Sequence, residues 1–141
     1  VVHPDNPIQT LTSDALRSLY TGQINTWESL VPGFKQPVQV WDYPAQDELH
    51  SIFLLSLWKT NPPPILAYQA PDPAAMLEAI AENPGAVGYL PSSWLKDSSV
   101  SLVSVDSAVK EALHQPVLLL SAQPPQGLAR SLLGCLQGNQ K

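Results

Sequence analysis

Strand-like and helix-like segments alternate along almost the whole chain, and proline or glycine ends most of them. Pro62-Pro63-Pro64 closes the most strongly helical segment, and Pro84-Gly85 closes the next. No internal repeat interrupts the alternation. This pattern predicts an α/β fold, with a mixed or partly parallel sheet flanked by helices. The 141 residues suffice for one domain with a hydrophobic core, so residues 1–141 are expected to form a single domain.

Capping residues and apolar spacing locate the elements. The residues Thr10 to Asp14 read as a helix start that Gly22 ends, and Asp72-Pro73 starts another helix. Further helices are predicted over 45–59 and 126–136, with short helical turns near Trp27 and over 91–95. Strands are predicted over 37–41, 65–69, 86–90, 100–105 and 116–121.

The four tryptophans are dispersed along the chain. Trp58, in the helix predicted over 45–59, is expected to lie in the hydrophobic core. Trp27, Trp41 and Trp94 stand at element ends, where an indole can be half exposed and line a cleft, or can pack in the core or at an edge. The single cysteine, Cys135, excludes an intrachain disulfide and is read as a buried, inert thiol.

Charge excludes two classes of partner. The net charge is −5, and the seven Lys and Arg residues are not clustered, so the electrostatic footprint of a nucleic-acid-binding protein is missing. Attraction to an anionic membrane surface is disfavoured for the same reason. No apolar run is long enough to cross a bilayer, so no membrane insertion of this segment is expected.

Catalytic and metal-binding signals are weak. His3, His50 and His114 are far apart, and none has a second His or Cys at ligand spacing. His50 with Asp47 and Glu48 is a conceivable weak divalent-cation site, but a solvated polar face at the start of a buried helix is the preferred interpretation of these residues. With no nucleophile elbow and no phosphate loop, no enzyme, metal or cofactor is predicted.

Two sequence segments carry a family resemblance. The first runs from Val1 through Asn6-Pro7 and Leu11-Thr12 to Tyr20-Thr21-Gly22-Gln23-Ile24-Asn25-Thr26-Trp27, and the second is Pro84-Gly85-Ala86-Val87-Gly88-Tyr89. Both resemble the second lobe of the phosphate-type (type II) periplasmic solute-binding proteins. A weaker match covers Gln115 to Leu120 and the residues from Gly127 to Gln140. The resemblance implies that the chain is one lobe plus a return segment of a longer two-lobed protein.

The family's anion-binding motif is not retained. In the family the second lobe offers Arg-x-x-x-Ser-Gly-Thr at the start of the long helix, where a guanidinium, hydroxyls and backbone N–H groups hold an anion. Aligned on Phe53, these positions are Tyr43, Asp47, Glu48 and Leu49. Two carboxylates about 4–6 Å from an incoming phosphate would each repel it by about 1 kcal/mol or more. The resemblance without its motif therefore implies altered or lost anion specificity.

These observations define an expected function and one alternative. The chain is expected to be the binding lobe of an extracytoplasmic solute-binding protein, periplasmic or at the cell surface, with a lipid anchor conceivable on a missing N-terminus. Its ligand is a small molecule or ion, neutral or cationic, lined by Tyr43, Gln46, Asp47 and Glu48, and its partner is an ABC-transporter permease. The alternative is an interaction or structural module that keeps the fold without binding a small ligand.

Overall fold

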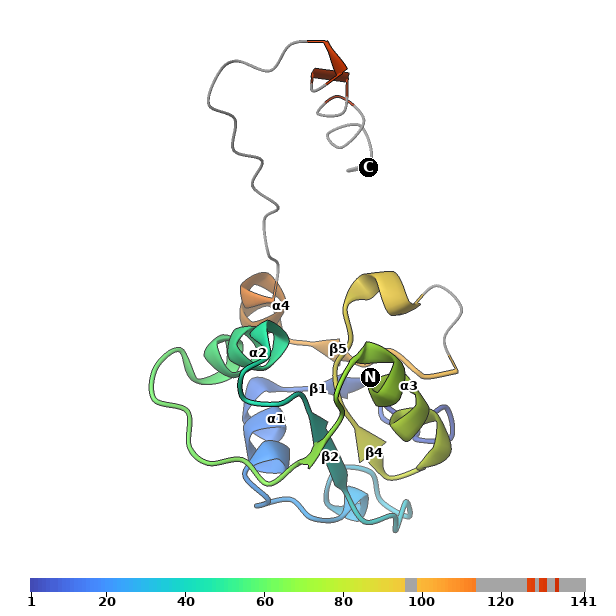
Figure 1. Cartoon of the computed structure of the whole chain (residues 1–141). Coiled ribbons are helices and arrows are strands. Elements are labelled where there is room, and N and C mark those ends of the chain that lie inside the picture. The colour runs from blue at the N-terminus through green and yellow to red at the C-terminus, as the bar shows by residue number, and fades with distance from the viewer. Residues whose placement is uncertain (96–98, 114–126, 129, 132–133, 135–141) are drawn as a thin grey trace.

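Short parallel strands form the centre of the structure, and helices cover both faces of them (Figure 1). This computed structural model describes residues 1–95, 99–113, 127, 128, 130, 131 and 134. The predicted strand 116–121, most of the predicted helix 126–136, Cys135 and His114 lie outside the described residues. Within the described part, no helix has both the length and the apolar character needed to cross a bilayer.

Five strands in the described part of the chain form two parallel groups. β1 (Thr10–Leu11) pairs with β5 (Ser104–Val105), and β2 (Gln39–Asp42) lies between β3 (Tyr68–Gln69) and β4 (Ala86–Val87). Every one of these ladders is parallel. Val2 links the two groups through antiparallel bridges to Val87 and Ser101. The predicted α/β class with a mixed, partly parallel sheet is thereby confirmed.

Among residues 1–95 and 99–113, four α-helices surround the strands: α1 (Ser13–Tyr20), α2 (Glu48–Trp58), α3 (Pro73–Glu82) and α4 (Ser107–Ala112). The 3-10 turns η1 (Trp27–Ser29) and η2 (Ser92–Leu95) fall where helical turns were predicted. In Figure 1, α3 lies on one side of the strands, and α1, α2 and α4 lie on the other. The separation follows from the sequence, since α1 and α2 bury Leu19, Tyr20 and Leu57 on one face, while α3 buries Met76 and Ile80 on the other.

N-cap side chains account for the helix starts, and two of these caps, Thr12 and Asp72, lie where the sequence predicts helix starts. Thr12 Oγ1 accepts the N–H of Ala15, Asp47 Oδ1 accepts that of Leu49, and Asp72 Oδ1 accepts that of Ala75. Gly22, the predicted stop of α1, has a φ of +73°, which glycine adopts without steric cost. Several limits of the prediction were wrong. The helix α2 begins at Glu48 and not at 45, because Asp47 is its cap, and β2 begins at Gln39 and not at 37. The strands β3, β4 and β5 each contain only two residues of the predicted strands.

The tryptophans divide differently from the prediction. Trp27 is fully buried, and its indole Nε1–H donates to the backbone oxygen of Gly85 at 2.9 Å. Trp94 is 41% exposed, and Trp58, predicted for the core, is only half-buried. The Trp27–Gly85 hydrogen bond joins the two segments that carry the family resemblance, 58 residues apart in the sequence.

Candidate functional site

The candidate site lies where the chain leaves β2 and β4. The carboxyl ends of neighbouring parallel strands meet at the same edge of a sheet, and ligands of α/β proteins commonly bind outside that edge. Asp42 is the last residue of β2, and the turn after it leads through Tyr43 and Gln46 into the N-terminus of α2. Tyr89 follows β4 by two residues, beside Asp42.

The Asp42 carboxylate holds these elements together. It is only 3% exposed. Its Oδ1 accepts the Tyr43 backbone N–H at 2.8 Å and the Tyr89 hydroxyl at 2.5 Å, and its Oδ2 lies 2.7 Å from Nδ1 of His50. A buried carboxylate is tolerated when it has such partners. One side chain thus ties the end of β2 to α2 and to the segment after β4.

Three aromatic rings pack together beside this carboxylate. The Phe53 ring stacks on Tyr89 with centroids 3.9 Å apart, and Tyr20 packs against Phe53 at 4.8 Å. Burial raises the pKa of the Tyr89 hydroxyl, and its hydrogen bond to Asp42 raises the pKa further. Burial, and then the charge of Asp42, likewise raises the pKa of Tyr20. These phenols are therefore neutral hydrogen-bond groups and not candidate bases.

The four residues predicted to line the site lie in one continuous turn, but they differ in exposure. Gln46 and Glu48 are exposed, and Asp47 is half-buried. Tyr43 is 1% exposed, and its hydroxyl donates to the backbone oxygen of Tyr89 at 3.2 Å. Tyr43 therefore lies behind the surface that the other three residues form, and it packs edge-on against the Tyr89 ring.

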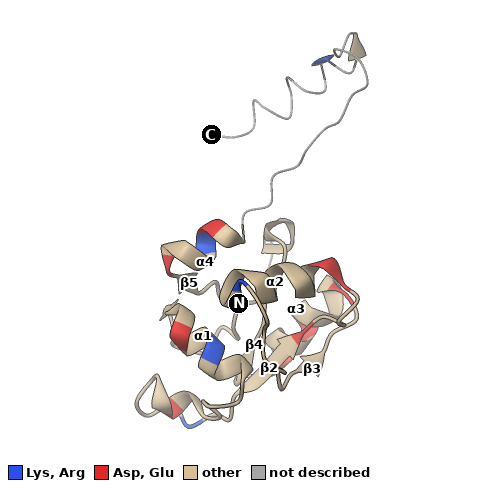
Figure 2. Ribbon diagram, turned by 90° about the vertical axis from the view of Figure 1, so that its left-hand side faces the viewer, with Lys and Arg blue, Asp and Glu red and all other residues tan. Residues whose placement is uncertain are grey.

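The surface of this turn is acidic. In Figure 2, Asp and Glu residues, coloured red, lie where the chain enters α2. Burial raises the pKa of Tyr43, and repulsion from the carboxylates of Asp47, Asp72 and Asp42 raises it further. Three carboxylates are thus close enough to act on one phenol. In the part of the chain that the structure describes, no group of three His, Cys, Asp or Glu side chains has the arrangement of a metal site.

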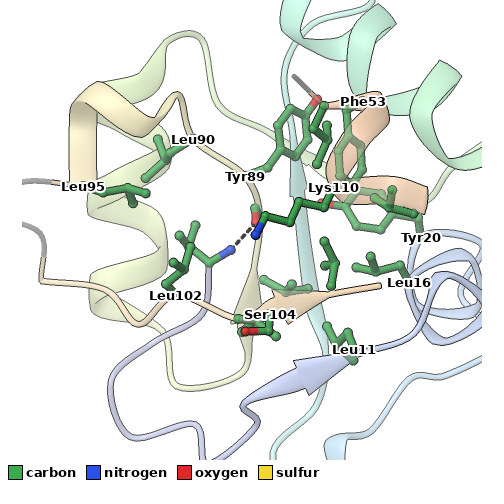
Figure 3. A pocket seen from close by; sticks show the side chains of 17 residues that line it. Leu11, Leu16, Tyr20, Phe53, Tyr89, Leu90, Leu95, Leu102, Ser104 and Lys110 are labelled. Carbon is green, nitrogen blue, oxygen red and sulfur yellow. Dashed lines mark hydrogen bonds between the residues drawn. The ribbon is translucent and has the colours of Figure 1, made fainter. Parts of the chain in front are cut away.

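A cavity of about 430 Å³ lies next to these residues, on the side of the strands that α1, α2 and α4 cover. Tyr20, Phe53 and Tyr89 line one part of its wall, and leucines from η2 and the segment before β5 line another (Figure 3). Its volume falls in the range of small-molecule pockets. Sequence patterns did not predict it, because its lining comes from elements far apart in the chain.

Two of the residues in the cluster were not predicted as site residues. Asp42 lies just after the strand predicted over 37–41 and was given no role, and Tyr89 was interpreted only as part of a strand and of a family motif. His50 was paired with Asp47 and Glu48, its neighbours in the sequence, but its partner in the structure is Asp42. The signal available was an acid directly after a buried strand, which often marks the ligand edge of an α/β sheet.

The sequence and the structure were both compared with known proteins. No family model matches the sequence. The sequence is 29% identical over 112 residues to the phosphate-binding protein PstS of Bacillus subtilis. This alignment covers 79% of this chain and 36% of PstS. An ABC-type phosphate transport receptor from Vibrio cholerae superposes with a TM-score of 0.69 at 24% identity, over 76% of this chain and 45% of the receptor.

A second solved structure agrees with the first. A candidate phosphate ABC transporter substrate-binding protein from Clostridium perfringens, solved with bound phosphate, has a TM-score of 0.65 and 25% identity over 74% of this chain and 42% of that one. In sequence and in fold, the chain is therefore similar to part of the phosphate-type, or type II, periplasmic binding proteins. It spans less than half of the length of each of these three relatives.

Proposed function

We propose that this chain is the second lobe, with its return segment, of an extracytoplasmic solute-binding protein that delivers its ligand to an ABC-transporter permease. Its ligand is a neutral or cationic solute, and the lobe does not bind phosphate in the way its relatives' motif would. The observation that carries the proposal is the Asp47 carboxylate, which occupies the N-terminus of α2 by accepting the Leu49 N–H at 2.8 Å.

A helix N-terminus binds anions because its first N–H groups lack partners within the helix and the helix dipole favours negative charge there. In this lobe the chain's own carboxylates take that role at three helices. Asp47 caps α2, Asp72 caps α3 with a hydrogen bond of 2.9 Å from Ala75, and Asp106 accepts the N–H of Ser13 in α1 at 2.8 Å. An incoming phosphate would have to displace a carboxylate.

Charge opposes phosphate as well. Asp47 and Glu48 stand at the two positions where the family motif has serine and glycine. Each would repel a phosphate about 4–6 Å away by about 1 kcal/mol or more. The two together correspond to a loss of about 30-fold in affinity before the missing arginine is considered. The same charges favour a cationic solute, or one rich in N–H donors.

One finding favours a module without a small ligand. Asp42 already accepts hydrogen bonds from Tyr43 and Tyr89 and contacts His50, and the Tyr43 side chain is buried. A site whose polar groups bond one another offers few contacts to a solute. Under this alternative the fold is kept as an interaction or structural module.

A thermal-shift screen of the full-length protein distinguishes the two functions, since a ligand that binds only the folded state raises the melting temperature. The panel contains inorganic phosphate and sulfate, amino acids, polyamines and neutral sugars, each at a concentration of about 1 mM. The proposal predicts stabilisation by a cationic or neutral member and none by phosphate. Stabilisation by no member of the panel favours the module, and stabilisation by phosphate contradicts the specificity proposed here.

A further inference from the structure

The cavity on the α1, α2 and α4 side of the strands has an apolar wall. Its volume is about 430 Å³, and most of the side chains around it are leucines, valines and aromatic rings (Figure 3). The Tyr20 hydroxyl donates to the backbone oxygen of Trp41 at 3.3 Å, and the Tyr89 hydroxyl donates to Asp42. Neither acceptor belongs to a residue that lines the cavity, so both tyrosines present ring carbons to it.

The cavity is open to solvent at the segment before β5. Leu102 lines the cavity and is 71% exposed. A single exposed leucine needs no explanation, but this one is continuous with an apolar wall that reaches back to Phe53 and Leu16. A solute can therefore enter from solution, and an apolar body that covers this wall removes apolar surface from water.

One charged side chain, that of Lys110, enters this apolar space. It extends from α4 into the cavity (Figure 3), and because the residue is exposed, its stem lies against the wall while the ammonium stays in contact with water. Among the described residues of the lining, none is Asp, Glu, His or Arg. The whole chain has the opposite balance, with 12 acidic residues against seven Lys and Arg. The wall thus presents positive side-chain charge and no negative side-chain charge.

These two properties together define the chemistry of a ligand. Small-molecule sites usually combine an apolar wall with a few polar or charged groups that fix the orientation of the ligand. An ammonium group offers three N–H donors and no acceptor, so its partner must be an acceptor, and an anionic one gives the stronger contact. A small inorganic anion would leave the apolar wall uncovered. The molecule that matches both the wall and the charge has an apolar body and an anionic head.

We propose that this cavity binds a small carboxylic acid with an apolar chain, whose carboxylate contacts Nζ of Lys110 and whose chain covers the wall between Leu102 and Phe53. The site is separate from the turn that follows β2, since Gln46, Asp47 and Glu48 do not line the cavity. The inference therefore goes beyond the proposed function and does not depend on the ligand proposed for that turn.

The test titrates the full-length protein with butyrate, hexanoate, octanoate and 1-octanol in a calorimeter, at a pH of about 7.5, where the acids are ionised. Octanoate is expected to bind with a dissociation constant of about 1 mM or below. Each step of two methylenes in the acid series should raise the affinity at least about 4-fold, the value of one fully buried methylene. Octanoate should bind at least about 3-fold more tightly than 1-octanol, within the range that a partly exposed ion pair supplies.

Matched variants test the contact with the head group. Lys110→Met keeps an unbranched apolar side chain and removes the charge. It should bind octanoate at least about 3-fold more weakly and should bind 1-octanol as the native protein does. The control is Lys35→Met, the same change at a side chain that is 77% exposed and does not line the cavity. Both positions are exposed, so both variants are expected to fold.

Backbone amide spectra locate the site. Octanoate should shift the amide resonances of residues 102–105 and 109–110 in a saturable way and leave those of residues 46–48 in place. Shifts confined to residues 46–48 would overturn the inference.

The calorimetric results can also overturn it. Absence of octanoate binding would mean that water or another part of the full-length protein fills the cavity. An affinity that does not grow with chain length would contradict the apolar wall as the binding surface. Undiminished octanoate binding by Lys110→Met would mean that the lysine only covers apolar surface. None of these results depends on whether phosphate or a cation binds at the turn after β2, so failure of this inference and failure of the proposed function can be told apart.

Discussion

Replacing Trp27 with phenylalanine tests how the two family segments are joined. The indole is fully buried, and its N–H donates to Gly85 at 2.9 Å. Gly85 O also accepts the N–H of Gln39 at 2.9 Å, so it keeps one partner in the variant, and the lost bond costs about 1 kcal/mol and not the full penalty of an orphaned carbonyl. The smaller ring leaves a cavity that adds about 1–2 kcal/mol.

The expected total is a loss of about 2–3 kcal/mol in the free energy of unfolding, measured by urea denaturation. The matched control is Trp94→Phe, because Trp94 is 41% exposed. That change should cost about 0.5 kcal/mol or less. Equal losses for the two variants would refute the assignment of Trp27 as the buried link between the segments.

Three further substitutions test a helix cap, the loss of stability at low pH and the packing of α3 against the strands. Asp47→Ala should lower stability by about 1 kcal/mol in urea, whereas Asp47→Ser, which keeps a capping oxygen, should cost much less. Hydrogen bonds from Ser13 lower the pKa of Asp106 in the folded protein. The carboxylate therefore stabilises the fold above its pKa in the unfolded chain, and this stabilisation is lost as the pH falls through its pKa in the folded protein. Asp106→Asn should make the melting temperature fall less steeply as the pH is lowered. Gly88→Ala should cost about 1–3 kcal/mol by calorimetric unfolding, because a Cβ there would lie 2.6 Å from Sδ of Met76 and 2.9 Å from Cδ1 of Ile80; an unchanged melting temperature would mean that α3 packs elsewhere.

Local signals predicted the helices well. The N-cap residues Thr12 and Asp72 start their helices as expected, because capping is a contact between residues two or three apart and can be read from the sequence. The helix α4 was missed, although Asp106 is a typical N-cap residue. Only Val109 of this helix is buried, so it has no apolar stripe to detect.

The site was harder to predict because it depends on contacts across the fold. Asp42 and Tyr89 meet because β2 and β4 are neighbours, and strand order does not follow from the composition of either strand. His50 reaches Asp42 only because the turn between them has one particular shape. The exposed positions Gln46 and Glu48 could be predicted, since they follow from the helix start alone, but the burial of Tyr43 could not.

Under the proposed function, the chain keeps the fold of the phosphate-type binding proteins, while the Asp47 carboxylate occupies the N-terminus of α2. Isothermal titration calorimetry of the full-length protein with inorganic phosphate, at low ionic strength and a pH of about 7.5, tests it most directly. We predict no saturable heat at phosphate concentrations up to about 1 mM, because Asp47 caps α2 and Glu48 adds a second charge. A saturable isotherm with a dissociation constant in the micromolar range or below would contradict the account.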